Sequence, residues 1–182
     1  MATRVELVFD FVSPNAYLVW QPLRALAARQ GAQIKITPAF LGGMHKLTGN
    51  APPFIRDAEV KGKNAYAKLE MQRFIEKHGF HRFKMNPNFP FNSVNLLRML
   101  VSLSGDDQIR FIDAMTPALW EEGLDVTDAA AVAAVLTKAG FDAEALAAKA
   151  QDPAIKQALI DNTEKAVERG TFGIPTFYIG EE

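Results

Sequence analysis

Cysteine is absent from the 182-residue sequence. Without a thiol, the chain cannot form a disulfide, supply a cysteine nucleophile or carry out dithiol exchange by itself. Any sulfur chemistry must therefore come from a bound ligand. The same absence argues against a thiol–disulfide oxidoreductase.

Histidine is scarce, and its three positions do not form a metal-binding pattern. His78 and His81 are three residues apart, but Gly79 lies between them and argues against a shared helix face. His45 is far from both in sequence. We therefore expect no metal site.

Charge of one sign and long apolar runs are also lacking. The 20 Lys and Arg residues nearly balance the 21 Asp and Glu residues, which argues against nucleic acid or an anionic membrane as the main partner. No apolar run is long enough to span a bilayer, and residues 1–4 lead directly into a strand pattern without a signal-peptide core. These features predict a cytoplasmic protein with neither nucleic acid nor membrane as a partner.

The central feature that is present is an apolar strand leading into a helix. Residues 5–12 carry apolar side chains on both faces, as a strand buried inside a sheet does. Ser13 is predicted to be the N-cap and Pro14 the first residue of a helix that ends near Gly31. The Ser13 side chain then lies beside the open amides of a helix N-terminus, where α/β sheets bind ligands and stabilise anions. The turn by itself favours the simpler reading that Ser13 is only a cap, because Ser-Pro is a common way to begin a helix.

A second strand is predicted over residues 33–40. Because a helix joins the two strands, they are expected to be parallel and to form a βαβ unit. The unit lacks the glycine-rich fingerprint of a nucleotide site. Residues 41–53 are rich in turn formers and are predicted to be a loop, in which Asn50 is either a turn residue or a binding residue.

Most of the remaining chain has helical periodicity. Helices are predicted over residues 57–77, 92–105, 106–122, 127–140, 142–150 and 152–170, with Pro117 as a kink or break. Lys61 and Lys63 are read most simply as solvated surface charges. A last strand is predicted from Pro175 to Glu182. Because no hairpin partner or helix follows it in the sequence, we expect either a truncated chain or a fold completed by further segments.

Four motifs, in order along the whole chain, give the sequence a resemblance to known proteins. It resembles the DsbA-like branch of the thioredoxin fold, and within it the 2-hydroxychromene-2-carboxylate isomerases and the related kappa-class glutathione transferases. The motifs are Phe-Asp-Phe-Val-Ser-Pro-Asn-Ala-Tyr-Leu (9–18), Thr-Gly-Asn-Ala-Pro-Pro (48–53), Trp-Glu-Glu-Gly-Leu-Asp-Val (120–126) and Gly-Thr-Phe-Gly-Ile-Pro-Thr (170–176).

The resemblance implies an α/β fold, a thioredoxin-like (DsbA-type) mixed sheet with a large all-helical insertion. Residues 1–41 and 171–182 would form the thioredoxin-like domain, and residues 42–170 the insertion domain. The C-terminal strand and helix of the family would be missing, together with a turn that holds the γ-glutamyl end of glutathione.

The resemblance also assigns roles to single residues. Ser13 occupies the place of the first cysteine of a Cys-x-x-Cys motif and would donate a hydrogen bond to the sulfur of bound glutathione. Asn50 and Lys63 would contact the tripeptide, although Lys61 competes with Lys63 for the alignment. The Ile174 backbone would pair with the cysteinyl part of glutathione. Pro175 would be a cis-proline, whereas the sequence alone favours trans because few X–Pro bonds are cis.

The implied function is a glutathione-dependent isomerase. The glutathione thiolate would add reversibly to an aromatic or conjugated carbonyl substrate, permit rotation about a bond and leave; Phe and Met residues of the insertion would line the substrate pocket. A kappa-like transferase and a non-catalytic thioredoxin-fold binding protein are the alternatives. The resemblance further implies a homodimer.

Overall fold

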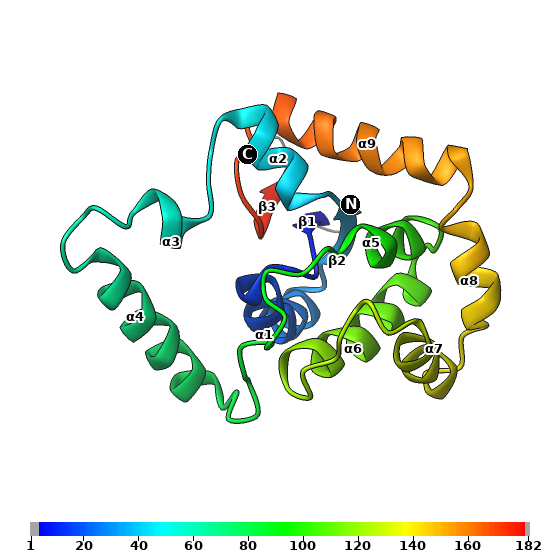
Figure 1. Cartoon of the computed structure of the whole chain (residues 1–182), viewed down its shortest axis with the longest axis horizontal. Helices are drawn as coiled ribbons and strands as arrows, with labels where there is room; N and C mark the ends of the chain where they lie inside the picture. The colour runs from blue at the N-terminus through cyan, green and yellow to red at the C-terminus, as the bar shows by residue number, and fades with distance from the viewer. Residues whose placement is uncertain (1–3, 181–182) are drawn as a thin grey trace.

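The computed structural model describes residues 4–180 and places a small sheet at the centre of the molecule (Figure 1). In this part of the chain the sheet has three strands in the order β2-β1-β3. β2 (Gln33–Pro38) is parallel to β1 (Arg4–Phe9), and β3 (Thr176–Ile179) is antiparallel to it. The predicted mixed α/β sheet, with its parallel βαβ beginning, is confirmed.

β1 is the central strand because both of its faces are apolar. Leu7, Val8 and Phe9 are fully buried, and Leu7 is opposite Ile36 of β2 and Phe177 of β3. The strand ends at Phe9 and does not reach residue 12 as predicted. After Phe9 the chain turns, and the turn brings the following helix back onto the sheet.

α1 (Pro14–Gln30) begins and ends where the sequence predicts. The Ser13 hydroxyl accepts a hydrogen bond from the Ala16 amide at 3.3 Å, Pro14 is the first helical residue, and Gly31 ends the helix with a positive φ of 61°. These are local cap signals that need no tertiary context.

Helices cover both faces of the sheet. The Phe9 ring of β1 packs against Trp20 of α1, with ring centroids 6.4 Å apart. On the opposite face, Val8 shares a cavity lining with Val101 of α5 (Val94–Val101) and Ala166 of α9 (Pro153–Glu168). Figure 1 shows α9 running across the sheet and α1 lying on its other side.

The other helices surround this core. α6 (Asp106–Trp120), α7 (Ala129–Lys138) and α8 (Ala143–Lys149) lie on one side of the sheet, and α4 (Lys63–His78) lies apart from them on the other (Figure 1). Asp128, Asp142 and Asp152 cap α7, α8 and α9 through their carboxylates, so these predicted starts are confirmed.

The predicted loop over residues 41–53 is wrong. It contains α2 (Leu41–Thr48) and the start of the short α3 (Pro53–Arg56). Gly42 and Gly43 are helical because the Phe40 ring packs against them; a Cβ on Gly42 would lie 2.8 Å from that ring. Close packing thus places two helix-breaking residues inside a helix.

One other predicted boundary is wrong, and the break predicted as one alternative at Pro117 is absent. The helix predicted from Asp57 starts at Lys63, because the intervening residues form turns that end at Gly62 with a positive φ of 83°. Pro117 does not break α6: it lies in the last turn, and the helix ends three residues later at Trp120. Because Pro117 has no amide hydrogen, the Asp113 carbonyl lacks its usual intrahelical donor, and the helix ends within one turn of Pro117.

The last strand is shorter than predicted. β3 covers residues 176–179, and residues 181 and 182 of the prediction lie outside the described residues. The division of the chain into domains at residues 41 and 171 stays a prediction.

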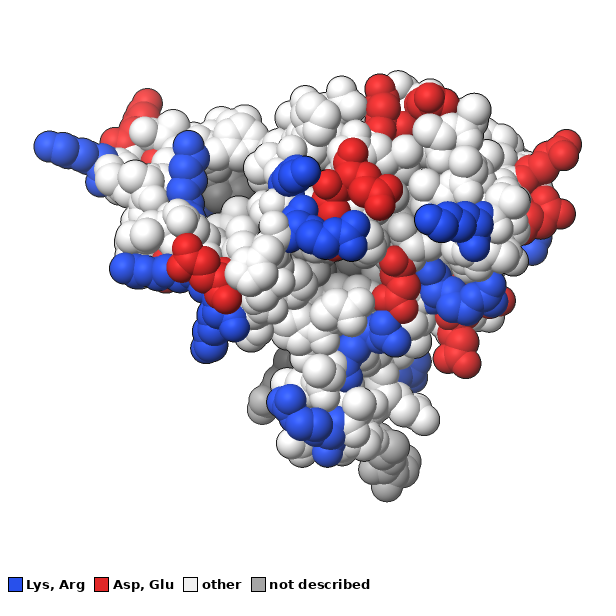
Figure 2. All heavy atoms as spheres, turned by 90° about the horizontal axis from the view of Figure 1, so that it is seen from below, with Lys and Arg blue, Asp and Glu red and all other residues white. Residues whose placement is uncertain are grey.

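Charges of both signs are interspersed over the face shown in Figure 2, which therefore has no broad field of one sign. Between residues 4 and 180, every helix is too short or too polar to cross a bilayer.

Candidate functional site

Ser13 joins the start of α1 to the segment that precedes β3. Its side chain is buried, with 4% of the residue exposed. The hydroxyl donates to the carbonyl oxygen of Ile174 at 2.9 Å and accepts from the Ala16 amide at 3.3 Å. The only proton of the hydroxyl is therefore directed at the Ile174 carbonyl.

The packing of the preceding turn fixes the position of Ser13. The Trp120 indole donates to the carbonyl of Phe11 at 3.1 Å, and the Phe11 ring lies edge-on to Phe111 of α6 at 5.8 Å. The Ser13 amide in turn donates to the carbonyl of Asp10 at 3.3 Å. The site residue thus lies on a turn held by the core of the molecule.

The segment that Ser13 contacts contains Ile174 and Pro175. Ile174 is buried, and the Ile174–Pro175 peptide bond is cis. The conformation expected from the resemblance is thus the one observed, and the trans form favoured by base rates is wrong here. Thr176 Oγ1 donates to the Gly173 carbonyl at 2.7 Å and closes the turn before β3.

Asn50 binds the same segment from another direction. Its side-chain amide donates to the carbonyl of Phe172 at 2.8 Å, and its Oδ1 accepts from the Ala51 amide at 2.9 Å. Ser13 and Asn50 therefore hold residues 172 and 174 of one loop, although 122 residues separate Asn50 from Phe172. The structure brings these predicted site residues together.

Lys63 reaches Asn50 only through two other residues. Its ammonium pairs with Asp57 Oδ1 at 2.9 Å, Arg56 binds Asp57 with two nitrogens at 2.9 Å each, and Arg56 Nη1 lies 3.4 Å from Asn50 Oδ1. Arg56 and Lys63 hold the pKa of the Asp57 carboxyl well below its usual range. Lys63 is therefore ion-paired, and its side chain is also 50% exposed, in agreement with its reading as a surface charge.

Arg56 and Asp57 are site neighbours that the sequence reasoning missed. Their adjacent opposite charges follow Pro52 and Pro53, and in sequence they are indistinguishable from ordinary surface charge. Only the turns after Asp57, which bring Lys63 back toward it, show that they form one cluster.

Asp10 was also missed. It is fully buried, its Oδ1 accepts from the Val12 amide at 3.1 Å, and its Oδ2 accepts from the Leu41 amide at 2.8 Å. Burial raises the pKa of Asp10 to about 6, against the lowering effect of the Ser93 hydroxyl and neighbouring amides. A lone acid inside the apolar run Phe9–Val12 is the sequence signal that could have identified it.

Tyr17, one helical turn after Ser13, faces an aromatic cluster. Its ring stacks on Phe83 at 5.7 Å, and its hydroxyl donates to Glu121 at 2.8 Å. Burial and the Glu121 carboxylate raise the pKa of Tyr17 above its usual range. Tyr17 is thus a neutral hydrogen-bond donor, and its phenolate form is disfavoured.

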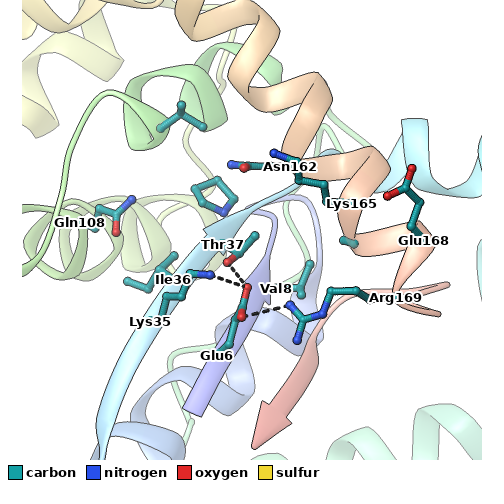
Figure 3. Close-up of a pocket in the computed structure, with 13 residues that line it drawn as sticks. Glu6, Val8, Lys35, Ile36, Thr37, Gln108, Asn162, Lys165, Glu168 and Arg169 are labelled. Atoms are coloured by element: carbon teal, nitrogen blue, oxygen red, sulfur yellow. Dashed lines mark hydrogen bonds and ion pairs between the residues drawn. The ribbon is translucent and has the colours of Figure 1, made fainter. Parts of the chain in front are cut away.

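One surface cavity lies away from these residues. It has a volume of about 400 Å³ and lies between β1, β2 and α9, with Glu6, Lys35, Lys165 and Arg169 among its lining (Figure 3). Burial would raise the pKa of Glu6, but hydrogen bonds from Thr37, Lys35 and Arg169 lower it to about 2. Its central charges are therefore paired with one another.

No group of three or more His, Asp or Glu residues within 4–180 is arranged to hold a metal ion. The side chains gathered around residues 172–175 are instead a hydroxyl, an amide and an ion-pair network, which suit a polar organic ligand.

The model of the DSBA-like thioredoxin domain matches residues 4–182. The chain belongs to this family. This DsbA-like protein is 31% identical over 182 residues to 2-hydroxychromene-2-carboxylate isomerase of Pseudomonas putida, an alignment that covers 98% of this chain and 86% of the relative. It is 27% identical to glutathione S-transferase kappa 1 of Rattus norvegicus, over 94% of this chain and 78% of the relative.

A solved structure agrees with the sequence match. This DsbA-like protein superimposes on a 2-hydroxychromene-2-carboxylate isomerase with a TM-score of 0.81 at 28% identity, covering 98% of this chain and 86% of the other. The DsbA-like thioredoxin fold expected from the four sequence motifs is therefore confirmed, in a protein whose sequence has no cysteine.

Proposed function

We propose that this protein binds glutathione at Ser13 and uses the glutathione thiolate to isomerise a small conjugated carbonyl compound. The observation that carries the proposal is the buried Ser13 hydroxyl, held at the N-terminus of the 17-residue helix α1 against the Ile174 carbonyl. A hydroxyl and a helix N-terminus both favour a thiolate over a thiol. The similarity to 2-hydroxychromene-2-carboxylate isomerases supports the same chemistry.

Binding would exchange one hydrogen bond for another. The Ile174 carbonyl now accepts the Ser13 proton at 2.9 Å. A peptide that pairs with Ile174 as a short strand places its own amide on that carbonyl. The Ser13 hydroxyl is then free to rotate and donate to the ligand sulfur, while the amide of Ala16 still anchors its oxygen.

Three further residues would orient the tripeptide. Asn50 holds the loop at Phe172 and offers its remaining hydrogen-bonding capacity to the ligand. Lys63, with Arg56 and Asp57, forms a cluster of net charge +1 that would attract a glutathione carboxylate. Pro175 would form the surface of the site beneath the glutathione sulfur.

The reaction consumes no glutathione. The thiolate attacks the β-carbon of the conjugated system and forms a C–S bond, and the π electrons of the double bond move to the carbonyl oxygen as an enolate. Rotation then occurs about a bond that has become single. Collapse of the enolate re-forms the double bond and expels the thiolate, so the atoms and electrons of the substrate are unchanged overall.

Exposed apolar residues flank the proposed site. Phe172 and Phe54 are 65% and 47% exposed, and both belong to the segments that carry the glutathione residues: Asn50 bonds to the Phe172 carbonyl, and Phe54 precedes Arg56 by two positions. These rings would provide the apolar surface for an aromatic substrate.

The first test is calorimetry with glutathione on the wild-type protein, Ser13→Ala and the hydroxyl-keeping variant Ser13→Thr. The pKa of the bound thiol is measured in the same three proteins from thiolate absorbance. A charge-assisted hydrogen bond is worth about 1.5–3 kcal/mol. The pKa of the bound thiol should therefore rise by about 1–2 units in Ser13→Ala. Ser13→Thr should keep most of the effect. Absence of wild-type binding would favour the non-catalytic alternative.

The second test is product analysis with 2-hydroxychromene-2-carboxylate and glutathione. An isomer recovered with free glutathione supports the proposal. A stable glutathione conjugate supports a kappa-like transferase instead, which the similarity to glutathione S-transferase kappa 1 makes the second candidate. The homodimer and the cytoplasmic location stay predictions; sedimentation of the purified protein checks the first.

A further inference from the structure

The buried Asp10 carboxylate bonds to two separate parts of the chain. Its Oδ1 accepts from the Val12 amide at 3.1 Å and its Oδ2 from the Leu41 amide at 2.8 Å, and 31 residues separate Asp10 from Leu41. The proposed chemistry assigns no role to this carboxylate, although it lies only three residues before Ser13.

The first of these parts is the turn that presents Ser13. The Asp10 side chain bonds to the Val12 amide and the Asp10 carbonyl accepts from the Ser13 amide at 3.3 Å. Asp10 therefore braces the turn through both its side chain and its main chain.

The second part is the helix that leads to Asn50. Leu41 is the first residue of α2, and the N-cap residue Phe40 supplies no side-chain cap. The Asp10 carboxylate takes the place of that missing cap. α2 ends at Thr48, two residues before Asn50. One carboxylate thus links the Ser13 turn to the helix that leads to Asn50, and Ser13 and Asn50 in turn bond to the loop at residues 174 and 172.

Within residues 4–180, Asp10 forms no ion pair with a basic side chain. The groups that act on its carboxyl are the Ser93 hydroxyl at the start of α5 and the amides of Leu41, Val12 and Phe11. The titratable or charged side chains on the neighbouring helices are not among these leading causes: Tyr17, Arg24 and Arg29 on α1, His45 and Lys46 on α2, and Arg98 on α5. Its charge state therefore depends on burial and on neutral donors, and burial places its pKa near 6.

We propose that Asp10 is a positioning residue of the glutathione site, whose carboxylate holds the Ser13 turn and the helix leading to Asn50 in the spacing that glutathione binding requires. The inference depends on the glutathione site proposed above. Protonation converts one Asp10 oxygen from an acceptor into a donor, which then faces an amide donor. One of the two bonds is lost, and either Ser13 or Asn50 leaves its place.

The test uses S-methylglutathione, which keeps the tripeptide but has no thiol to titrate. Its affinity is measured by calorimetry between pH 5 and pH 8. Wild-type affinity should fall about tenfold from pH 7 to pH 5, because about a tenth of a group with a pKa near 6 is ionised at pH 5. Asp10→Asn should bind about tenfold more weakly than wild type at pH 7.5, with no inflection near pH 6.

Two control variants separate Asp10 from other groups. Asp142→Asn alters an aspartate that caps α8 through the Ala145 amide at 2.9 Å, far from Ser13 in the chain, and should keep the wild-type profile. His45→Gln removes an imidazole on α2 whose pKa is lowered by burial and by Arg56. The inflection near pH 6 should persist in both.

Ser93→Ala gives a readout that a purely structural role would not move. The Ser93 hydroxyl lowers the pKa of Asp10. However, the Ser93 hydroxyl makes no hydrogen bond of ordinary geometry, and the Ser93 side chain does not cap α5. The variant should therefore fold, and the inflection in S-methylglutathione affinity should shift to higher pH. This variant keeps the proposal testable even if Asp10→Asn fails to fold.

The outcomes distinguish this inference from the proposed function. Wild-type affinity that is constant from pH 5 to pH 8 overturns the role of Asp10 and leaves the glutathione site intact, as does a wild-type profile in Asp10→Asn or an unmoved inflection in Ser93→Ala. Absence of wild-type binding at every pH overturns the glutathione site, and the positioning role with it.

Discussion

The hydroxyl of Ser13 donates to the carbonyl of Ile174 at 2.9 Å across 161 residues of sequence. The same oxygen caps α1 through the Ala16 amide. One side chain therefore contributes to helix stability, to the closure of the sheet and to the proposed binding of sulfur, and these contributions can be measured separately.

Ser13→Ala should lower the free energy of unfolding by about 2–3 kcal/mol. Loss of a cap costs about 1 kcal/mol, and the buried Ile174 carbonyl, left without its donor, adds about 1–2 kcal/mol. Urea unfolding measures the change. Asp142→Ala, which removes a cap alone, should cost only about 1 kcal/mol; equal costs in the two variants would show that the Ile174 contact adds nothing.

Lys63→Gln should weaken glutathione binding, whereas Lys61→Gln should not. Lys63 belongs to the cluster that extends through Asp57 and Arg56 to Asn50. An exposed ion pair is worth about 0.5–1 kcal/mol, so we expect about a two- to fivefold loss of affinity by calorimetry. The loss should shrink as salt is added. A larger effect of Lys61→Gln would reverse the assignment of the two lysines.

The free energy of unfolding should decrease as pH rises from about 4 to about 6, because of Asp10. Burial raises its pKa from 3.8 to about 6 in the folded state, so the folded state binds the proton more tightly than the unfolded state. The stabilisation is full below pH 4 and is lost as pH rises through 6, with an upper bound of about 3 kcal/mol.

Chemical unfolding at several pH values measures this slope. Asp10→Asn has no titrating group at this position and should lack the slope. If wild type and variant keep parallel profiles, then another group is responsible for the pH dependence.

Glu6→Gln should destabilise the protein by about 1–2 kcal/mol, more than Lys35→Gln does. Glu6 accepts from Lys35 at 3.0 Å and from Arg169 at 3.1 Å, and the Thr37 hydroxyl also donates to it. Gln keeps one amide oxygen as an acceptor but removes the negative charge and the second acceptor oxygen that the three donors share, whereas removing Lys35 leaves Glu6 two partners. Thermal and urea unfolding of both variants compare the costs, and a larger loss in Lys35→Gln would contradict this.

The same Glu6 network predicts the opposite pH dependence from Asp10. Its pKa is lowered from 4.5 to about 2 on folding, so its stabilisation is present above pH 4.5 and is lost as pH falls through 2. In Glu6→Gln the loss of stability below pH 4.5 should be smaller than in wild type.

Local signals explain which parts of the fold were predictable. The apolar pattern of β1, the Ser13 cap and Gly31 are encoded within a few residues of each other. α2 could not be predicted in this way, because its stability comes from partners distant in sequence: the Asp10 carboxylate caps it and the Phe40 ring packs on its glycines.

The residues of the candidate site were likewise predictable only where the signal is local in sequence. The position of Ser13 at a helix N-terminus follows from sequence alone, but its pairing with Ile174 was expected only through resemblance to a family. The network of Arg56, Asp57 and Lys63 escaped prediction because turns after Asp57 create it. The adjacent charges of Arg56 and Asp57 do not by themselves indicate that the chain turns back toward them.

The sheet order has a consequence for the way the protein is made. β1 leaves the ribosome long before β3, its antiparallel partner, which is synthesised only after the helices from α1 to α9. The intervening loop is long, and its closure carries an entropic cost. A nascent chain that has not yet reached residue 174 therefore lacks the acceptor for the Ser13 hydroxyl, and exposes one edge of its central strand to cellular chaperones or to other nascent chains.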